Sequence, residues 1–180
     1  MFGRIASASL LLLLTLTACK DMPVNRDQSR ELTTVSAVDL DRYTGRWYEI
    51  ARVPNSFEEG CVAVTATYSK NPDGTVRVIN RCHLLTLTGK ESVAVGSARI
   101  VDSKTNAKLA VTFFWPFEGD YWILSLADDY SWVLVGEPSG KYLWILARSP
   151  RISDGLRADL VTRLNAIGYN AKALYWTPQP

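Results

Sequence analysis

The stretch that decides the fold reads Gly45-Arg46-Trp47-Tyr48-Glu49-Ile50-Ala51-Arg52, and a short acidic segment precedes it. Glycine at position 45 lets the backbone turn tightly where a strand begins, because it has no side chain to clash. Trp47 follows two residues later, and alternate residues of a strand share one face of the sheet. The sequence therefore predicts a strand that starts at Gly45, with the Trp47 ring closing one end of a barrel.

Two later motifs extend this reading. The pair Asp129-Tyr130 follows Asp128, and Arg148 ends the run Tyr142-Leu143-Trp144-Ile145-Leu146-Ala147. In this order, and from about Asp39 to Pro178, the chain resembles the lipocalin family, in particular the bacterial outer-membrane lipoprotein lipocalins. The resemblance implies that the guanidinium of Arg148 lies across Trp47 and reaches backbone carbonyls, which suits a planar fork of donors. It assigns structural roles to Gly45, Trp47, Asp129, Tyr130 and Arg148. Asp128 stands where the family often has threonine, which leaves the turn role of Asp129 intact.

The first residues predict a signal peptide. An apolar run, Leu10 to Leu14, is shorter than the roughly 20 residues that a membrane-spanning helix needs. It is followed by Leu16-Thr17-Ala18-Cys19, which resembles the bacterial lipobox and implies cleavage before Cys19 and lipidation of its sulfur. The alternative is an ordinary signal peptide with a chance cysteine. Lys20 lacks the acidic character of an inner-membrane retention signal, so we expect an anchor at the periplasmic face of the outer membrane.

These assignments divide the chain into residues 1–18 as signal peptide, 19–36 as a lipid-anchored tether and 37–180 as the lipocalin domain. The folded part has the length of one domain. The whole chain has 20 Lys and Arg residues against 18 Asp and Glu residues, a formal net charge of +2. A nearly neutral chain with mixed charges lacks the basic stripe of a nucleic-acid-binding protein. Nucleic acid is therefore not an expected partner.

The rest of the chain predicts an all-β fold. Short strands separated by turns indicate an eight-stranded antiparallel up-and-down barrel, and such closure removes sheet edges. One C-terminal helix is expected between Ser153 and Gly168, with its apolar stripe packed against the outside of the barrel. A last short strand is expected over 173–176. The expected barrel strands begin at Gly45 and cover 61–68, 75–82, 91–101, 108–115, 121–127, 131–136 and 141–148.

Two cysteines remain once Cys19 is assigned to the lipid. Cys61 and Cys82 bracket the turn signal Asn71-Pro72-Asp73-Gly74, and an exported protein favours their oxidation. A hairpin centred between Asn71 and Pro72 places the two cysteines opposite each other. A three-residue loop over Pro72-Asp73-Gly74 instead places them on opposite faces of the sheet. A one-residue bulge in one strand would allow both this loop and a contact between the cysteines. We predict a disulfide between Cys61 and Cys82, with two buried thiols as the alternative.

The sequence offers little for catalysis. Its one histidine, His83, is adjacent to Cys82, and neighbouring side chains on a strand point apart. Asp128 and Asp129 are better explained as turn residues than as an acid–base pair. We find no nucleophile elbow, phosphate-binding loop or metal-ligand set. The chain is therefore expected to be no enzyme and to need no cofactor, although enzymes on lipocalin-like barrels exist.

Counting in steps of two predicts which side chains face the lumen. If Arg148 points inward, so do Tyr142, Trp144 and Leu146, while the Trp47 face continues through Glu49, Ala51 and Val53. On the strand over 108–115, the larger rings favour Val111 and Phe113 inward. Glu49 and Arg52 are available near a head group. The alternative is that the aromatic rings fill a solid core. The predicted ligand-binding residues are Tyr142, Trp144, Leu146, Phe113, Val111, Ala51 and Glu49.

The sequence thus predicts an outer-membrane lipoprotein lipocalin that binds and stores or transports a hydrophobic ligand. The resemblance implies a fatty acid or lysophospholipid and a role in membrane maintenance. The expected partners are a lipid ligand and the membrane, with a homodimer left open. Two alternatives remain: a lipid-modifying enzyme on the same barrel, and a ligand-free scaffold lipoprotein.

Overall fold

Eight antiparallel strands close into a barrel, and a ninth short strand extends it. The computed structural model describes residues 22–180, so the predicted signal peptide and Cys19 lie outside the described part. Neighbouring strands pair in the order β2-β3-β4-β5-β6-β7-β8-β1-β9, and pairing of β1 with β2 closes the barrel. The predicted all-β barrel with one outer C-terminal helix is confirmed. Its strands are β1 (Gly45–Arg52), β2 (Cys61–Lys70), β3 (Val76–Leu84), β4 (Glu91–Ile100), β5 (Lys108–Phe114), β6 (Phe117–Leu126), β7 (Trp132–Gly136), β8 (Leu143–Ala147) and β9 (Tyr175–Trp176).

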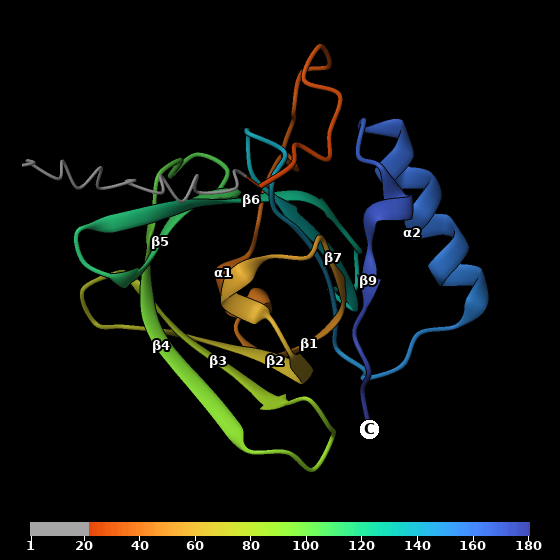
Figure 1. Cartoon of the computed structure of the whole chain (residues 1–180). Coiled ribbons are helices and arrows are strands. Elements are labelled where there is room, and N and C mark those ends of the chain that lie inside the picture. The colour runs from red at the N-terminus through yellow and green to blue at the C-terminus, as the bar shows by residue number, and fades with distance from the viewer. Residues whose placement is uncertain (1–21) are drawn as a thin grey trace, which may run out of the picture.

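Helix α1 (Leu40–Tyr43) lies at one end of the barrel, and helix α2 (Asp154–Ala166) lies at its side. In Figure 1 the short helix α1 appears within the ring of strands, and α2 lies outside it. Ser153 caps α2 as expected, since its side chain accepts a hydrogen bond from the Leu156 amide. Leu160 and Leu164 are fully buried on the barrel wall. No helix among residues 22–180 is long and apolar enough to cross a membrane. Two single-turn 3-10 helices, η1 (Ser56–Glu58) and η2 (Ala171–Ala173), complete the elements.

The apolar side chains form two main clusters separated by the sheet. The inner cluster fills part of the lumen and includes Trp47, Val78, Leu109 and Leu146. The outer cluster joins the sheet to α2 and includes Leu134, Ile145, Ala147 and Leu160. Leu146 belongs to the inner cluster and its neighbours Ile145 and Ala147 to the outer one, which is the alternation expected of β8.

A bulge in β2 resolves the register of the cysteine hairpin. Near the turn, Lys70 faces Val76 across the hairpin, whereas Cys61 faces Leu84, so the register shifts by one residue between Val62 and Thr65. Ala63, within the shift, has a φ of 50°. The extra residue brings Cys61 and Cys82 together as a disulfide, with their Cα atoms 5.4 Å apart. The predicted disulfide is confirmed.

Residues 22–36 lie against the barrel, and the assignment of residues 19–36 as a lipid-anchored tether stays a prediction. The Asn25 amide donates to Gly140 O, the Asp27 amide to Gly168 O and the Val35 amide to Ile123 O. Most of these contacts join backbone atoms, and the sequence of a polar segment carries no signal for them. Whether residues 1–18 are a signal peptide stays a prediction.

The two ends of the barrel differ. β1 begins beside α1, so α1 and the loops β2–β3, β4–β5 and β6–β7 mark one end, here called the closed end. Because the strands are antiparallel, the loops β1–β2, β3–β4, β5–β6 and β7–β8 meet at the other end, here called the mouth. The short elements α1, η1 and η2 were not predicted, and β6 starts at Phe117 rather than near Tyr121.

Candidate ligand-binding lumen

The closed end is sealed by Trp47 and Arg148. The Arg148 guanidinium lies 3.7 Å from the centre of the Trp47 ring, and Trp47 is fully buried. The guanidinium also donates to the carbonyl oxygens of Arg46 at 2.8 Å and Arg42 at 2.7 Å. Gly45 has a φ of 92°, a left-handed conformation that favours glycine. The geometry is the one that the sequence motif implied.

The Asp-Tyr motif attaches the same end to α1. The side chain of Asp129 accepts a hydrogen bond from the Ser131 amide at 2.9 Å, and the Ser131 side chain together with this amide lowers the pKa of the Asp129 carboxyl. The Tyr130 hydroxyl accepts a hydrogen bond from the Asp39 amide at 2.8 Å, and Arg42 lies over the Tyr130 ring. The motif therefore shapes a turn and holds the segment that leads into α1.

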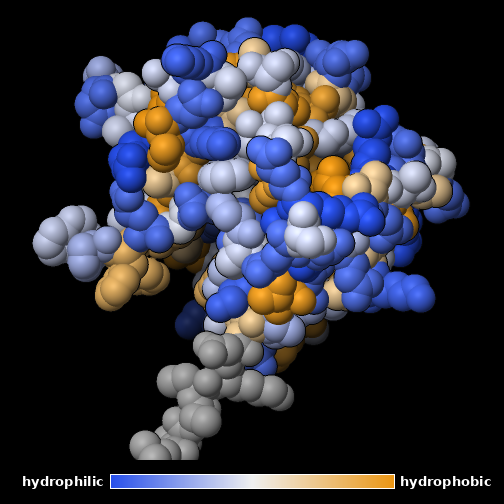
Figure 2. All heavy atoms as spheres, turned by 90° about the horizontal axis from the view of Figure 1, so that it is seen from above, coloured by the Kyte–Doolittle hydropathy of each residue, from blue (hydrophilic) through white to orange (hydrophobic). Residues whose placement is uncertain are grey.

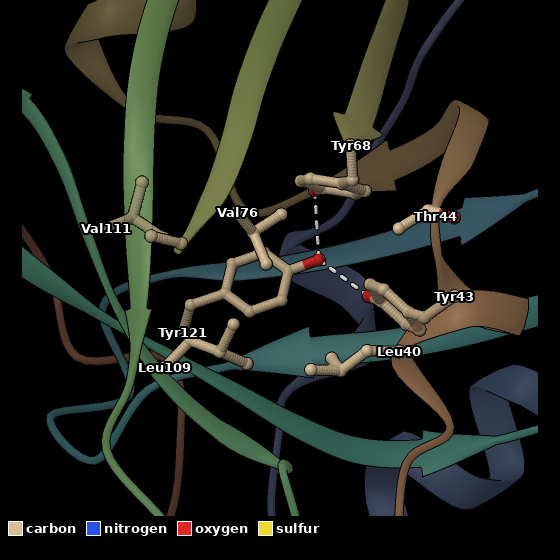
Figure 3. A pocket seen from close by; sticks show the side chains of 9 residues that line it. Leu40, Tyr43, Thr44, Tyr68, Val76, Leu109, Val111 and Tyr121 are labelled. Carbon is tan, nitrogen blue, oxygen red and sulfur yellow. Dashed lines mark hydrogen bonds between the residues drawn. The ribbon is translucent and has the colours of Figure 1, made fainter. Parts of the chain in front are cut away.

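Three tyrosine hydroxyls meet on the floor of the lumen. Tyr121 bonds to Tyr43 at 2.7 Å and to Tyr68 at 3.0 Å, as Figure 3 shows. Burial raises the pKa of Tyr68 to about 12. Among residues 22–180 these rings line a cavity of about 20 Å³, roughly the space of one water molecule. The floor is thus nearly filled, and an acyl chain would have to lie above it.

Above the floor, an aromatic wall faces a wall of small side chains. Trp144 and Tyr142 stack in parallel with their ring centres 5.9 Å apart, on and next to β8. On β4, the partners of the inward-facing Val76 and Val78 are Ala98 and Gly96, so Ala94 and Ser92 continue this inner face. Because β4 and β8 are four strands apart in the ring, the two walls lie opposite each other. These small residues of β4 were not among the predicted lining residues, although their alternation with Val93 and Val95 indicates an inner face.

Five of the seven predicted lining residues belong to, or pack against, one of the two apolar clusters. Val111, Phe113 and Trp144 pack against the inner cluster, and Leu146 belongs to it, so these lie where the sequence placed them. Ala51 does not face the lumen as predicted, because the β1–β8 register shifts between Glu49 and Ala51. The shift turns Ala51 into the outer cluster, so counting in steps of two fails there.

A buried charged cluster lies at the mouth side of the lumen. Arg52 donates to Glu49 at 2.6 Å, and Thr177 also donates to Glu49. Glu58 accepts from the Trp144 indole at 3.0 Å, which fixes that ring. Burial raises the pKa of Glu49 to about 8, and the nearby charge of Glu58 adds to this effect. Two carboxyls thus share one guanidinium, so the cluster carries no surplus positive charge.

Asn80 on β3 contributes a buried polar atom without a hydrogen-bond partner within residues 22–180. Asn80 lies between the inner-facing positions Ala66 and Ala94, and its Oδ1 is buried without a hydrogen bond among the described residues. Such an atom is costly to bury without a partner. Asn80 was not predicted to have a role, since an isolated asparagine in a strand carries no binding signal. Residues 22–180 contain no group of His, Cys, Asp and Glu side chains placed to hold a metal ion.

Comparison with known proteins decides the family. Residues 38–179 match the family model of the lipocalin-like domain. The chain is a lipocalin. It is 39% identical over 151 residues to the outer membrane lipoprotein Blc of Escherichia coli, covering 84% of this chain and 85% of that protein. It is 38% identical over 161 residues to temperature-induced lipocalin-1 of Arabidopsis thaliana, with coverage of 84% and 85%.

Other lipocalins extend the comparison. The outer membrane lipoprotein Blc of Vibrio cholerae is 34% identical over 165 residues and matches over 91% of this chain and 92% of its own. Among solved structures, insecticyanin from the tobacco hornworm Manduca sexta superimposes with a TM-score of 0.67 at 19% identity, covering 83% of this chain and 85% of its own. At that identity the likeness concerns the fold. The lipocalin fold of this chain is therefore shown by both sequence and structure.

Proposed function

We propose that this lipocalin binds a single-chain lipid, a fatty acid or a lysophospholipid, and stores or transports it for maintenance of the outer membrane. The observation that carries the proposal is the two-walled lumen, with Trp144 and Tyr142 facing the small residues of β4. Aromatic and aliphatic walls favour an apolar chain, and few polar groups suffice to orient its head. The lipocalin relatives support a hydrophobic ligand.

The ligand would enter with its head group at the mouth. Its acyl chain would pass between Trp144 and the inner face of β4 and end above the tyrosine floor. Glu49 and Arg52 would lie near the head group, and Asn80 would accept a hydrogen bond from a hydroxyl or amine of the ligand. A zwitterionic head suits a cluster without surplus positive charge, and this favours the lysophospholipid.

The protein would be held at the periplasmic face of the outer membrane by lipid chains on Cys19. The lipobox-like Leu16-Thr17-Ala18-Cys19 and the relatives called outer membrane lipoprotein support this. Acyl chains contribute about 0.8 kcal/mol per buried CH₂, so several of them would hold the chain permanently. Cys19→Ser should abolish labelling by radioactive palmitate and release soluble protein, and unchanged labelling would contradict the anchor.

Titration with lysophospholipid, followed by tryptophan emission, tests ligand binding. A saturable change with one site is expected in the delipidated protein carrying Cys19→Ser. Trp144→Phe is the matched variant, because it keeps an aromatic ring in the wall while removing the indole that a ligand would contact. It should remove much of the emission change and leave the fold intact. A folded, delipidated protein that binds no single-chain lipid would refute the proposal and favour a ligand-free scaffold.

A further inference from the structure

The mouth carries the most exposed large apolar side chains among residues 22–180. They are Trp115 (88% exposed), Leu85 (80%), Phe114, Phe117 and Phe57, here called the apolar rim. All five belong to the loops β1–β2, β3–β4 and β5–β6 or to the strand ends beside them. Figure 2 shows one face of the molecule, on which hydrophobic side chains lie in patches among hydrophilic ones. A gathering like the apolar rim marks an interaction surface.

Two of the three loops that carry the rim are in direct contact. The Leu85 amide donates to Gly60 O at 2.7 Å, which joins the β3–β4 loop to the β1–β2 loop. The ring of Phe57 packs on Tyr142 at 5.5 Å and Trp144 at 6.4 Å, so the β1–β2 loop also covers the lumen wall. The β1–β2 and β3–β4 parts of the rim therefore lie beside the lumen wall, at the end through which a ligand would enter.

The described chain also begins at the mouth. Met22 lines a surface pocket together with Asn55 and Ser56 of the β1–β2 loop and with Leu85. Asn25 is bonded to Gly140 in the β7–β8 loop. Cys19 precedes Met22 by three residues, and peptide geometry keeps it within about 11 Å of Met22. An anchor on Cys19 would therefore enter the membrane beside the mouth and away from the closed end.

We infer that the apolar rim rests in the bilayer that holds the anchor, so that the lumen opens onto the membrane surface. This deepens the proposed function and rests on its lipid anchor for the site of docking. Tryptophan and phenylalanine at a rim suit the interface between head groups and acyl chains. The mouth loops carry both charge signs, Glu59 and Glu118 with Lys90 and Lys141. Apolar contact, with little selectivity for lipid charge, holds the rim in place, and a ligand passes between bilayer and lumen without crossing water.

A fluorescent label on the rim tests the orientation. The lipidated full chain carrying Leu85→Cys is labelled with an environment-sensitive dye and placed in phosphatidylcholine vesicles or in phosphatidylethanolamine–phosphatidylglycerol vesicles. Val101→Cys is the matched control, because Val101 is an exposed apolar residue (52%) in the β4–β5 loop of the closed end. The label at position 85 should shift to the blue and be quenched by spin-labelled lipid in both vesicles, while the label at 101 stays in water.

Equal exposure of both labels to water would overturn the inference, as would insertion of the label at 101. A blue shift at 85 that needs no vesicles and grows with protein concentration would assign the rim to a second copy of the chain and also overturn it. Labelling of Cys19 itself would show that the anchor has failed, separately from the rim.

Ligand transfer gives an independent readout. Leu85→Glu should slow transfer of a fluorescent fatty acid from vesicles to the barrel about tenfold, equivalent to about 1.4 kcal/mol. Its affinity for monomeric ligand in solution should be unchanged, and Val101→Glu should match the unmodified protein in both assays. Equal transfer rates in the two variants would contradict the role of the rim. Absence of ligand binding in every variant would refute the proposed function, while the labels still decide the orientation.

Discussion

Removal of the Trp47–Arg148 contact should reveal how the closed end stabilises the barrel. Trp47 is fully buried and its indole donates to Tyr43 O at 2.8 Å, so Trp47→Ala leaves a cavity and removes one of the two hydrogen bonds to that carbonyl, which Arg148 also donates to. We expect a loss of about 3–5 kcal/mol in the free energy of unfolding. Arg148 is partly exposed, so solvent screening weakens its contribution to stability. Arg148→Ala should therefore lower the free energy of unfolding by about 1–2 kcal/mol.

The assay is urea unfolding of the two single variants and the double variant. Because the guanidinium and the indole are in contact, the two losses should fall short of additivity by about 0.5–1.5 kcal/mol. Arg46→Ala is the control, since Arg46 is an exposed neighbour on β1 whose side chain has no hydrogen bond or ion pair in the described structure. It should change stability by less than about 0.5 kcal/mol. Additive losses for Trp47 and Arg148 would refute the stabilising contact.

Two further predictions concern the cysteine pair and the buried carboxyl. Reduction of the Cys61–Cys82 disulfide, which closes a separation of 21 residues, should lower the free energy of unfolding by about 3 kcal/mol; two titratable thiols in the unreduced, unfolded protein carrying Cys19→Ser would contradict it. Burial raises the pKa of Glu49 from 4.5 to about 8. At pH values between these two, Glu49 keeps its proton in the folded protein and has lost it in the unfolded chain. Stability should therefore fall as pH rises through this window, by at most about 1.4 kcal/mol per pH unit. Glu49→Gln should flatten the profile, and an unchanged profile would count against a buried proton.

Much of the fold was predictable because the signals are local. The Gly45-x-Trp47 motif, the Asn71–Gly74 turn and the capped stripe of α2 each specify structure through neighbouring residues. The face of β8 was also predictable, since alternation from Arg148 places Trp144 and Leu146 inward without a bulge.

The remaining features depend on contacts that sequence spacing does not carry. The bulge after Glu49 turned Ala51 outward, and nothing in the sequence marks its position. Residues 22–36 are held by hydrogen bonds between backbone atoms and distant parts of the chain. Backbone bonds leave no mark on side-chain composition, so the sequence of this polar segment does not reveal them. The hydroxyl cluster of Tyr43, Tyr68 and Tyr121 joins α1, β2 and β6, which are far apart along the chain.

Native mass spectrometry tests the central claim, that the lumen holds one single-chain lipid. The protein carrying Cys19→Ser, incubated with lysophospholipid, should show one bound lipid per chain. Leu146→Glu should lose this species while staying folded by circular dichroism, because it places a carboxylate in the apolar lumen. A chain that carries no lipid, or one whose lipid is retained equally by Leu146→Glu, would contradict binding in the lumen.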